Sequence, residues 1–262
     1  MKSILELDPA SACALQGVVF DVDDTLTRAG RVEAPAFQAL WQLKAAGLAL
    51  IAVTGRPLGF AELMARQWPI DAAVGENGAG YIRVTERALE LGYYAPDEQR
   101  AGDAAALARV RARVELEAPF ARYTDDSWAR RCDVAWDVAE RQQLSAAQIA
   151  ELRRLIEAEG ARCLVSSVHA HAAIGEYDKA RGAVQAGAAI GFDLAGARER
   201  WLFVGDSGND APAFAYFTLT AAVANVIGHL DSLPVAPRYV TQADRGVGFA
   251  ELTATLLSLR AA

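Results

Sequence analysis

The fold of this chain is decided by the stretch Val18-Val19-Phe20-Asp21-Val22-Asp23-Asp24-Thr25-Leu26-Thr27, in which an apolar run leads directly into carboxylates. The β-branched and aromatic residues of the run predict a buried strand. Ligands of open α/β sheets bind beyond the carboxyl ends of the strands, so Asp21 and Asp23 would stand at that edge, close enough to share one cation. The alternative is that the three aspartates only cap a turn and the helix after it.

The composition of the chain is that of an ordinary globular protein. It has 262 residues, of which 53% are hydrophobic and 23% charged, enough for one large domain or two modest ones. The formal net charge of −7 argues against a general nucleic-acid binder, which needs a basic face. It leaves room for a small anionic substrate, because the charge inside a pocket can oppose the net charge.

The cysteines and the apolar segments of the sequence indicate the cellular compartment in which the protein is expected. Cys13, Cys132 and Cys163 are odd in number and form no CxxC pair, which favours reduced thiols. Residues 1–15 lack the apolar core of a signal peptide, and no run reaches the roughly 18 apolar residues that span a bilayer. We therefore expect a cytoplasmic protein that has no membrane partner. The oligomeric state is left open.

Strands alternate with helices in both halves of the chain, which predicts a doubly wound parallel sheet of the α/β class. In the first half, after the opening strand, the pattern predicts helices over residues 34–46 and 58–67 and strands over 48–53 and 70–74. In the second half it predicts helices over 179–190 and 248–259, with apolar strands at 201–204, 219–224 and 239–240.

The middle of the chain breaks this alternation. Strand patterns at 81–84 and 89–94 precede a long helix over 97–117, and residues 131–138 alternate strictly, which predicts a strand with one wet face. A capping box at Ser145 opens a second helix that ends at Gly160, and residues 164–174 are extended. The pattern therefore predicts a core domain made of residues 1–80 and 176–262, with an α+β module of residues 81–175 inserted into it.

Four polar clusters follow the apolar strands or open a helix, so the sheet would gather them around one crevice. Carboxylates can hold Mg²⁺, while a lysine, a hydroxyl and free backbone N–H groups can hold a phosphate. Each cluster alone could be a helix cap or a solvated face. The four clusters are Asp21 with Asp23, Thr54-Gly55-Arg56, Lys179, and Asp206 with Asn209 and Asp210.

Together these residues resemble the four motifs of the haloacid dehalogenase superfamily of phosphotransferases, in the order of that family. The DxDxT motif corresponds to residues 21–25, the second motif to Thr54, the third to Lys179 and the GDxxND motif to residues 205–210. The inserted module resembles the cap of class IIB (Cof-like) members, which include sucrose-phosphate, mannosyl-3-phosphoglycerate and trehalose-phosphate phosphatases. The loop at residues 76–79 resembles the segment that precedes such a cap.

The resemblance implies a Mg²⁺-dependent phosphatase acting on a small phosphate ester, most simply a sugar phosphate. Asp21 would attack phosphorus to give an aspartyl-phosphate, and Asp23 would serve as acid and base. The implied roles of the other residues are as follows: phosphate binding by Thr54, Gly55, Arg56, Lys179 and Asn209, and metal binding by Asp21, the Asp23 backbone carbonyl, Asp206 and Asp210.

Several alternatives stay open at this stage. A phosphomutase acting on a hexose phosphate shares this core and cap class, and a non-catalytic phosphate sensor would keep the fold. A dehalogenase is disfavoured because it does not need the second aspartate or the full Mg²⁺ set. The resemblance also has one departure, since Asp24 stands where the family usually has Gly. An inward Asp24 side chain would weaken the binding of an anion.

The inserted module offers weaker candidates. Arg130 and Arg131, with Trp128 and Tyr123 nearby, would either read a sugar or carboxylate or form a solvated face beside a core aromatic. His169 and His171 alternate on one strand and are expected on a surface that faces the cleft. Glu176 and Tyr177 are expected at the hinge that returns from the module, and Trp41, Trp68 and Trp201 in the core.

Overall fold

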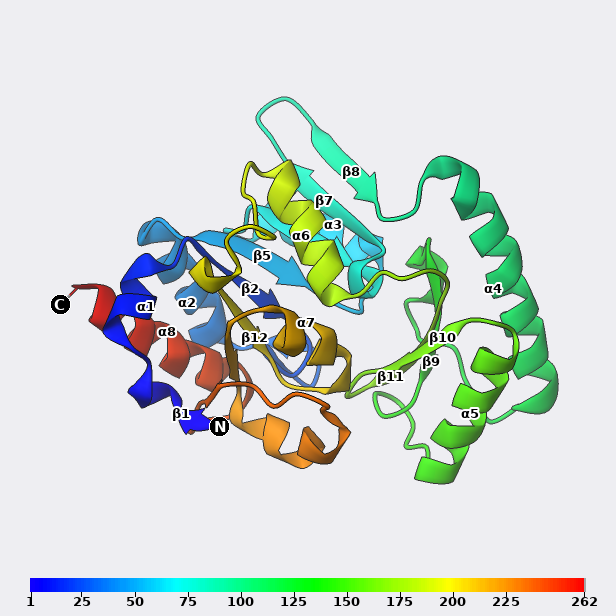
Figure 1. Ribbon diagram of the computed structural model, residues 1–262. Helices are drawn as coiled ribbons and strands as arrows, with labels where there is room; N and C mark the ends of the chain where they lie inside the picture. Colours follow the sequence, from blue (N-terminus) through cyan, green and yellow to red (C-terminus); the bar gives the residue numbers. More distant parts are fainter. Residues whose placement is uncertain (262) are drawn as a thin grey trace.

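The computed structural model describes residues 1–261, the side chain of residue 232 excepted, and is built on one large twisted sheet (Figure 1). The strand order is β1-β14-β13-β12-β2-β5-β6-β7-β8, parallel as far as β6 and antiparallel at β7 and β8. The predicted doubly wound α/β core is therefore confirmed. The strands are β1 (Lys2–Ser3), β2 (Gly17–Asp21), β5 (Ala49–Val53), β6 (Ala72–Gly75), β7 (Gly80–Val84), β8 (Leu89–Tyr93), β12 (Trp201–Gly205), β13 (Leu219–Ala222) and β14 (Tyr239–Val240).

Helices cover both faces of this sheet because its central strands are apolar on both sides. Val18 and Phe20 of β2 pack with one set of helices, and Val19 packs with the other. The first set is α1 (Pro9–Ala14), α2 (Ala34–Ala45), α3 (Leu58–Gln67) and α8 (Arg245–Ala261), and the second is α6 (Lys179–Ala189) and α7 (Ala211–Tyr216). No helix within residues 1–261 is long and apolar enough to cross a membrane.

A second, smaller unit of helices and strands lies at one end of the molecule (Figure 1). Helices α4 (Asp97–Glu117) and α5 (Ala146–Ala158) pack on a three-stranded antiparallel sheet in the order β10-β11-β9. Their own apolar core includes Val110, Trp136 and Leu155. The strands are β9 (Asp133–Asp137), β10 (Arg162–Val165) and β11 (His169–Ala173). We call this unit, residues 94–175, the cap.

Three expectations need correction. The strands predicted at 81–84 and 89–94 form the hairpin β7–β8, which pairs with β6 and so extends the large sheet instead of opening the cap. Strand β9 has no wet face: all five of its residues are buried, because its polar side is turned toward the core domain. Trp41 is 55% exposed, since α2 buries the opposite face through Ala39, Leu40 and Leu43.

Small elements complete the chain. The hairpin β3 (Thr27–Arg28) and β4 (Arg31–Val32) follows the Asp-rich turn. Short 3₁₀ turns are η1 (Ile4–Glu6), η2 (Glu76–Gly78), η3 (Ser127–Ala129), η4 (Arg198–Arg200), η5 (Gly208–Asp210) and η6 (Ala224–Ser232). As predicted, Trp201 is fully buried, and Trp68 packs against the core as a partly buried side chain.

Candidate active site

The site lies where β12, β2 and β5 end side by side. Their order in the sheet brings Asp206, Asp21 and Thr54, each at or just after the end of its strand, to one edge. Asp210 comes from the turn η5 and Lys179 from the first residue of α6, which Asp178 caps through the Arg181 N–H. The topology therefore gathers the four predicted clusters, as the strand pattern indicated.

Lys179 is the centre of the site. Its Nζ lies 2.5 Å from Asp21 Oδ1 and 2.6 Å from Asp210 Oδ1, and its side chain is fully buried. Burial opposes the charge of Lys179, but the carboxylates of Asp21 and Asp210 raise its pKa above the usual value. Thr25 Oγ1 donates to the other oxygen of Asp21 at 3.1 Å. Asp21 is thus held by a cation and a hydroxyl.

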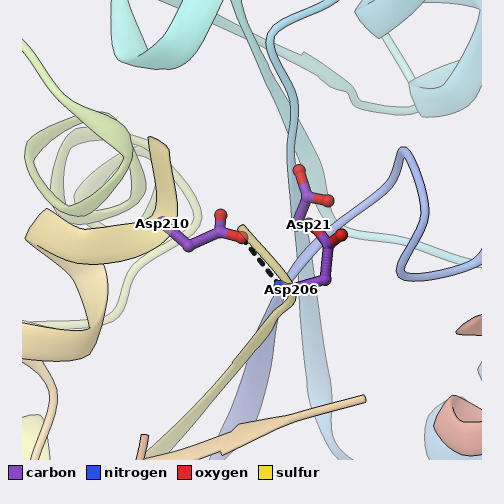
Figure 2. A group of neighbouring side chains, drawn as sticks. All are labelled: Asp21, Asp206 and Asp210. Atoms are coloured by element: carbon purple, nitrogen blue, oxygen red, sulfur yellow. Dashed lines mark hydrogen bonds between the residues drawn. The ribbon is translucent and has the colours of Figure 1, made fainter. Parts of the chain in front are cut away.

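Three carboxylates form a candidate cation site (Figure 2). One oxygen from each of Asp21, Asp206 and Asp210 lies within 4.8 Å of the others, and all three residues are buried. Asp206 Oδ1 has no hydrogen-bond partner among the residues described, while Asn225 Nδ2 donates to Asp206 Oδ2 at 2.9 Å. Burial, and after it the charges of the neighbouring carboxylates, raises the pKa of Asp206 well above its usual value. Burial also raises the pKa of Asp21 to about 7, although the positive charge of Lys179 acts to lower it.

These observations fit a divalent cation. Buried carboxylates that repel one another need a positive charge between them, and oxygen atoms are the ligands that Mg²⁺ prefers. Lys179 supplies one such charge to Asp21 and Asp210, while Asp206 Oδ1 has no partner among the described residues. The side chain of Asp23 is not part of this cluster of three carboxylates.

Asp23 is paired with Arg56 instead. The guanidinium of Arg56 donates to both oxygens of Asp23 at 2.9–3.1 Å, and Thr54 Oγ1 lies 3.4 Å from Asp23 Oδ2. The same guanidinium reaches the cap, where it pairs with Asp126 at 3.3 Å and Glu140 at 2.9 Å. Arg56, expected beside phosphate, thus joins the second aspartate to the cap.

Gly55 lies where the cap approaches most closely. Its carbonyl accepts a hydrogen bond from Arg130 Nη1 at 3.0 Å. A Cβ at this position would lie 3.2 Å from both Asn77 Oδ1 and His171 Nε2, so a larger residue would push these side chains away. The hydrogen bonds of Asn209 go to Ser207 and Asn77, and therefore connect the fourth motif with the loop η2 rather than with Lys179.

Asp24 adopts a left-handed backbone conformation with φ of 57°, which explains why glycine suits this position. Its backbone N–H donates to Thr27 Oγ1 at 3.0 Å. The carboxylate of Asp24 pairs with Arg245 at 2.8 Å. Arg245 therefore balances the negative charge of an aspartate that stands where the resembled family usually has glycine.

The cap candidates divide into buried and exposed residues. Arg130 is not on a solvated face: its side chain is 2% exposed and pairs with Asp126 and Asp133. Trp128 is 84% exposed, whereas Tyr123 stacks on the buried Trp136. Arg131 donates to the hydroxyl of Tyr93. At the hinge, Tyr177 is buried and Glu176 is exposed.

His169 and His171 face the cleft, as expected, and both are buried there. With Gly55 they line a small cavity beside Asp21 and Asp23. Glu76 was not singled out from the sequence, yet it accepts hydrogen bonds from four backbone N–H groups, one on Leu58 and three on residues 131–133. Its position in a polar loop after a strand was the only signal for it.

The structure is an α/β fold with a buried carboxylate cluster at the carboxyl ends of its central strands and a cap over that edge. Residues 18–98 match the family model of haloacid dehalogenase-like hydrolases. This range contains the first two of the four motifs, residues 21–25 and Thr54, and the match agrees with their resemblance to this family. No curated protein sequence matches the chain significantly.

Solved structures share the fold over nearly the whole chain. Protein 0175 of Thermoplasma acidophilum is similar with a TM-score of 0.72 and 18% identity, over 94% of this chain and 99% of the other. Sucrose-phosphatase of Synechocystis sp. PCC6803, in complex with sucrose and phosphate, gives a TM-score of 0.66 and 15% identity, over 92% and 98%. The C-terminal domain of C. albicans trehalose-6-phosphate phosphatase gives 0.65 and 12%, over 95% of each chain.

Proposed function

We propose that this hydrolase is a Mg²⁺-dependent phosphatase that releases phosphate from a sugar phosphate through an aspartyl-phosphate. The observation that carries the proposal is the buried Lys179, which bridges Asp21 and Asp210 beside the carboxylate of Asp206. A phosphate monoester resists attack because its anionic oxygens repel a nucleophile, and a site of this kind supplies both the nucleophile and the opposing charge.

Each side chain has a role in this proposal. Lys179 and Thr25 each hold one oxygen of Asp21, and Asp21 attacks phosphorus while the bond to the leaving oxygen breaks. Asp23 gives a proton to that leaving oxygen and later takes one from the water that cleaves the aspartyl-phosphate. Arg56 orients Asp23 through the paired hydrogen bonds. The Thr54 hydroxyl, the Gly55 N–H, Lys179 and Asn209 are the proposed phosphate ligands.

A bound divalent cation would complete the charge balance of the site. When bound, Mg²⁺ would neutralise charge on the transferring phosphoryl group. Asp21, Asp206 and the Asp23 backbone carbonyl would hold it, with Asp210 in or next to the ligand set. The support for this arrangement is the unpartnered Asp206 oxygen within the carboxylate cluster.

A sugar phosphate is the proposed substrate class, and two of the structural neighbours are a sucrose-phosphatase and a trehalose-6-phosphate phosphatase. Acidic net charge supports a small-molecule substrate rather than nucleic acid. The proposed site of action is the cytoplasm, which the odd number of cysteines supports.

A substrate panel tests the proposal. Phosphate release is measured with sugar phosphates, phosphoglycerate glycosides and nucleotides, in Mg²⁺ and after removal of Mg²⁺ with EDTA. We expect release from one or more sugar phosphates that stops with EDTA and returns with added Mg²⁺. Isomerisation of a hexose phosphate without phosphate release would make the protein a mutase, and no turnover on any ester would contradict the proposal.

A further inference from the structure

Two buried polar atoms beside Gly55 have no hydrogen-bond partner in the described part of the chain. They are His171 Nε2 on β11 of the cap and Asn77 Nδ2 in the turn η2 of the core. A Cβ on Gly55 would lie 3.2 Å from the first and 3.3 Å from the second, so the two atoms are no more than about 6.5 Å apart. Buried polar atoms are normally paired, and two unpaired ones at one place point to a ligand.

The hydrogen bonds around His171 make its Nε2 an acceptor. Nδ1 lies 2.8 Å from Asp133 Oδ2, and Asp133 is itself paired with Arg130 at 2.9 Å. An ionised carboxylate only accepts, so the proton of the imidazole is on Nδ1. Burial lowers the pKa of His171 to about 4, which leaves the ring neutral at pH 7 and its Nε2 without a proton.

The hydrogen bonds around Asn77 make its Nδ2 a donor. Ser207 Oγ donates to Asn209 Oδ1 at 3.1 Å, which leaves Asn209 Nδ2 to donate to Asn77 Oδ1 at 3.0 Å. The amide of Asn77 is therefore oriented by a chain of hydrogen bonds that starts in the fourth motif, and its Nδ2 is left free to donate.

His171 and Asn77 line two different cavities, which have Ser166 and Asn209 in common. The cavity that Asp21, Asp23, Gly55 and His171 line has a volume of about 10 Å³, close to the minimum for a single water. A wider cleft of about 530 Å³ adjoins it, lined by Asn77 and Lys179 and sharing Ser166 and Asn209 with the small cavity. The cleft is large enough for the remainder of a small ligand.

We propose that His171 and Asn77 form a subsite that binds a hydroxyl group of the leaving alcohol, next to the phosphate ester. A hydroxyl can donate to His171 Nε2 and accept from Asn77 Nδ2, whereas a carboxylate or a fully ionised phosphate has no proton to donate to His171. The inference rests on the proposed phosphatase function and narrows its substrates to polyol phosphates, in which hydroxyl-bearing carbons neighbour the ester carbon.

A pair of esters tests the subsite in the wild-type protein. Glycerol 3-phosphate and n-propyl phosphate have the same carbon chain, but only the first carries hydroxyls. With Mg²⁺ present we expect kcat/KM to be at least about tenfold higher for glycerol 3-phosphate, because the plain ester leaves two buried polar atoms unpaired. Equal values for the two esters would overturn the subsite.

A variant then assigns the preference to His171. H171N keeps an amide donor for Asp133 and removes the Nε2 acceptor, so we expect the ratio of the two kcat/KM values to fall toward one. His169 is the matched control, since its Nε2 is already paired with Glu140 at 2.7 Å; H169N should keep the wild-type ratio. Circular dichroism confirms that both variants are folded, and an unchanged ratio in folded H171N would contradict the role of His171.

Failure of the subsite is distinguishable from failure of the proposed function. Mg²⁺-dependent release from both esters at equal efficiency would leave a phosphatase without this subsite. No release from these or any other ester would remove the phosphatase itself, and with it the inference.

Discussion

Lys179 shows how a single residue organises the site. A buried ammonium between two carboxylates at 2.5 and 2.6 Å replaces the water that each charge would otherwise need. Removing one partner of such a group leaves the others buried and uncompensated, which costs more than the pair contributes. Lys179 therefore holds the buried carboxylates of the site together, and in the proposed function it also opposes the charge of the phosphate.

K179M is expected to destabilise the protein by about 3 kcal/mol, because Asp21 and Asp210 would lose their shared cation. Urea unfolding measures the difference. The matched control is K44M, which breaks a partly exposed pair with Asp71 and should cost less than about 1 kcal/mol. Equal losses in the two variants would contradict the central position of Lys179.

For Asp24 we predict that substitution changes the stability of the protein only slightly. D24G loses the partly exposed ion pair with Arg245 but relieves a positive φ of 57°. The two effects oppose each other, so the free energy of unfolding should change by less than about 1 kcal/mol. A loss above about 2 kcal/mol in urea unfolding would show that the Asp24 carboxylate has a structural role that the ion pair does not explain.

Single residues were predictable where a motif fixed their place along the chain. Lys179 and Asp206 were singled out because they correspond to the third and fourth motifs of the resembled family, in the order of that family. His171 and Asn77 were not predictable as a pair, because they meet only when the cap packs on the core. The partner of Asp24 is 221 residues away in the sequence, and no local pattern indicates it.

At the scale of elements, the strand β11 turns its polar face to the strand ends that carry Asp21 and Gly55. His169 and His171 lie on this face, and β9 beside it supplies Asp133. The alternation of residues 131–138 correctly predicted a two-faced strand, but sequence could not show that the polar face would meet another domain instead of water. The assignment of the hairpin β7–β8 to the inserted module was wrong for a similar reason. Its sequence pattern predicts two strands but does not show that β7 pairs with β6 of the large sheet.

The neutral state of His171 predicts a pH dependence of stability. Its pKa is lowered from 6.5 to about 4 by burial, so its contribution is fully present above pH 6.5 and is lost as the pH falls toward 4. The loss from this group amounts to about 3 kcal/mol at most. Urea unfolding of wild type and H171N between pH 7 and 4 measures it: the wild-type stability should fall more steeply, and parallel curves would contradict the assignment.

At the scale of the whole molecule, the cap is closed on the core. Arg56 joins Asp23 to Glu140 and Asp126, and Arg130 reaches the Gly55 carbonyl. The cavity beside Asp21 and Asp23 holds about 10 Å³, too little for a phosphate ester. Placing a phosphate ester against both Asp21 and Asp23 requires this cavity to widen, and we predict that it widens by movement of the cap away from the core.

A disulfide across the interface tests this requirement. A Cβ on Gly59 of α3 would lie 3.7 Å from the Cβ of Ala129 in the cap, which suits a disulfide. The oxidised double variant G59C/A129C should lose phosphate release, and reduction should restore it. The single variant G59C is the control for reaction at the native cysteines. Full turnover of the cross-linked protein would show that the cap need not move.

The arrangement of the whole molecule was predictable in outline. Alternating strands and helices gave the α/β core, and the change of pattern gave an inserted cap, because both depend on local periodicity. The closed interface was not predictable, since Glu76, Glu140 and Arg130 meet their partners through contacts between distant segments.

The central claim is that Asp21 carries the phosphoryl group. Its most direct test is phosphate release from an aryl phosphate by wild type and D21N, with Mg²⁺ present and with folding checked by circular dichroism. We predict that the wild type releases phosphate and that D21N loses the activity by at least about a thousandfold while it stays folded, because an amide cannot replace the nucleophile. Undiminished phosphate release by D21N would contradict the account.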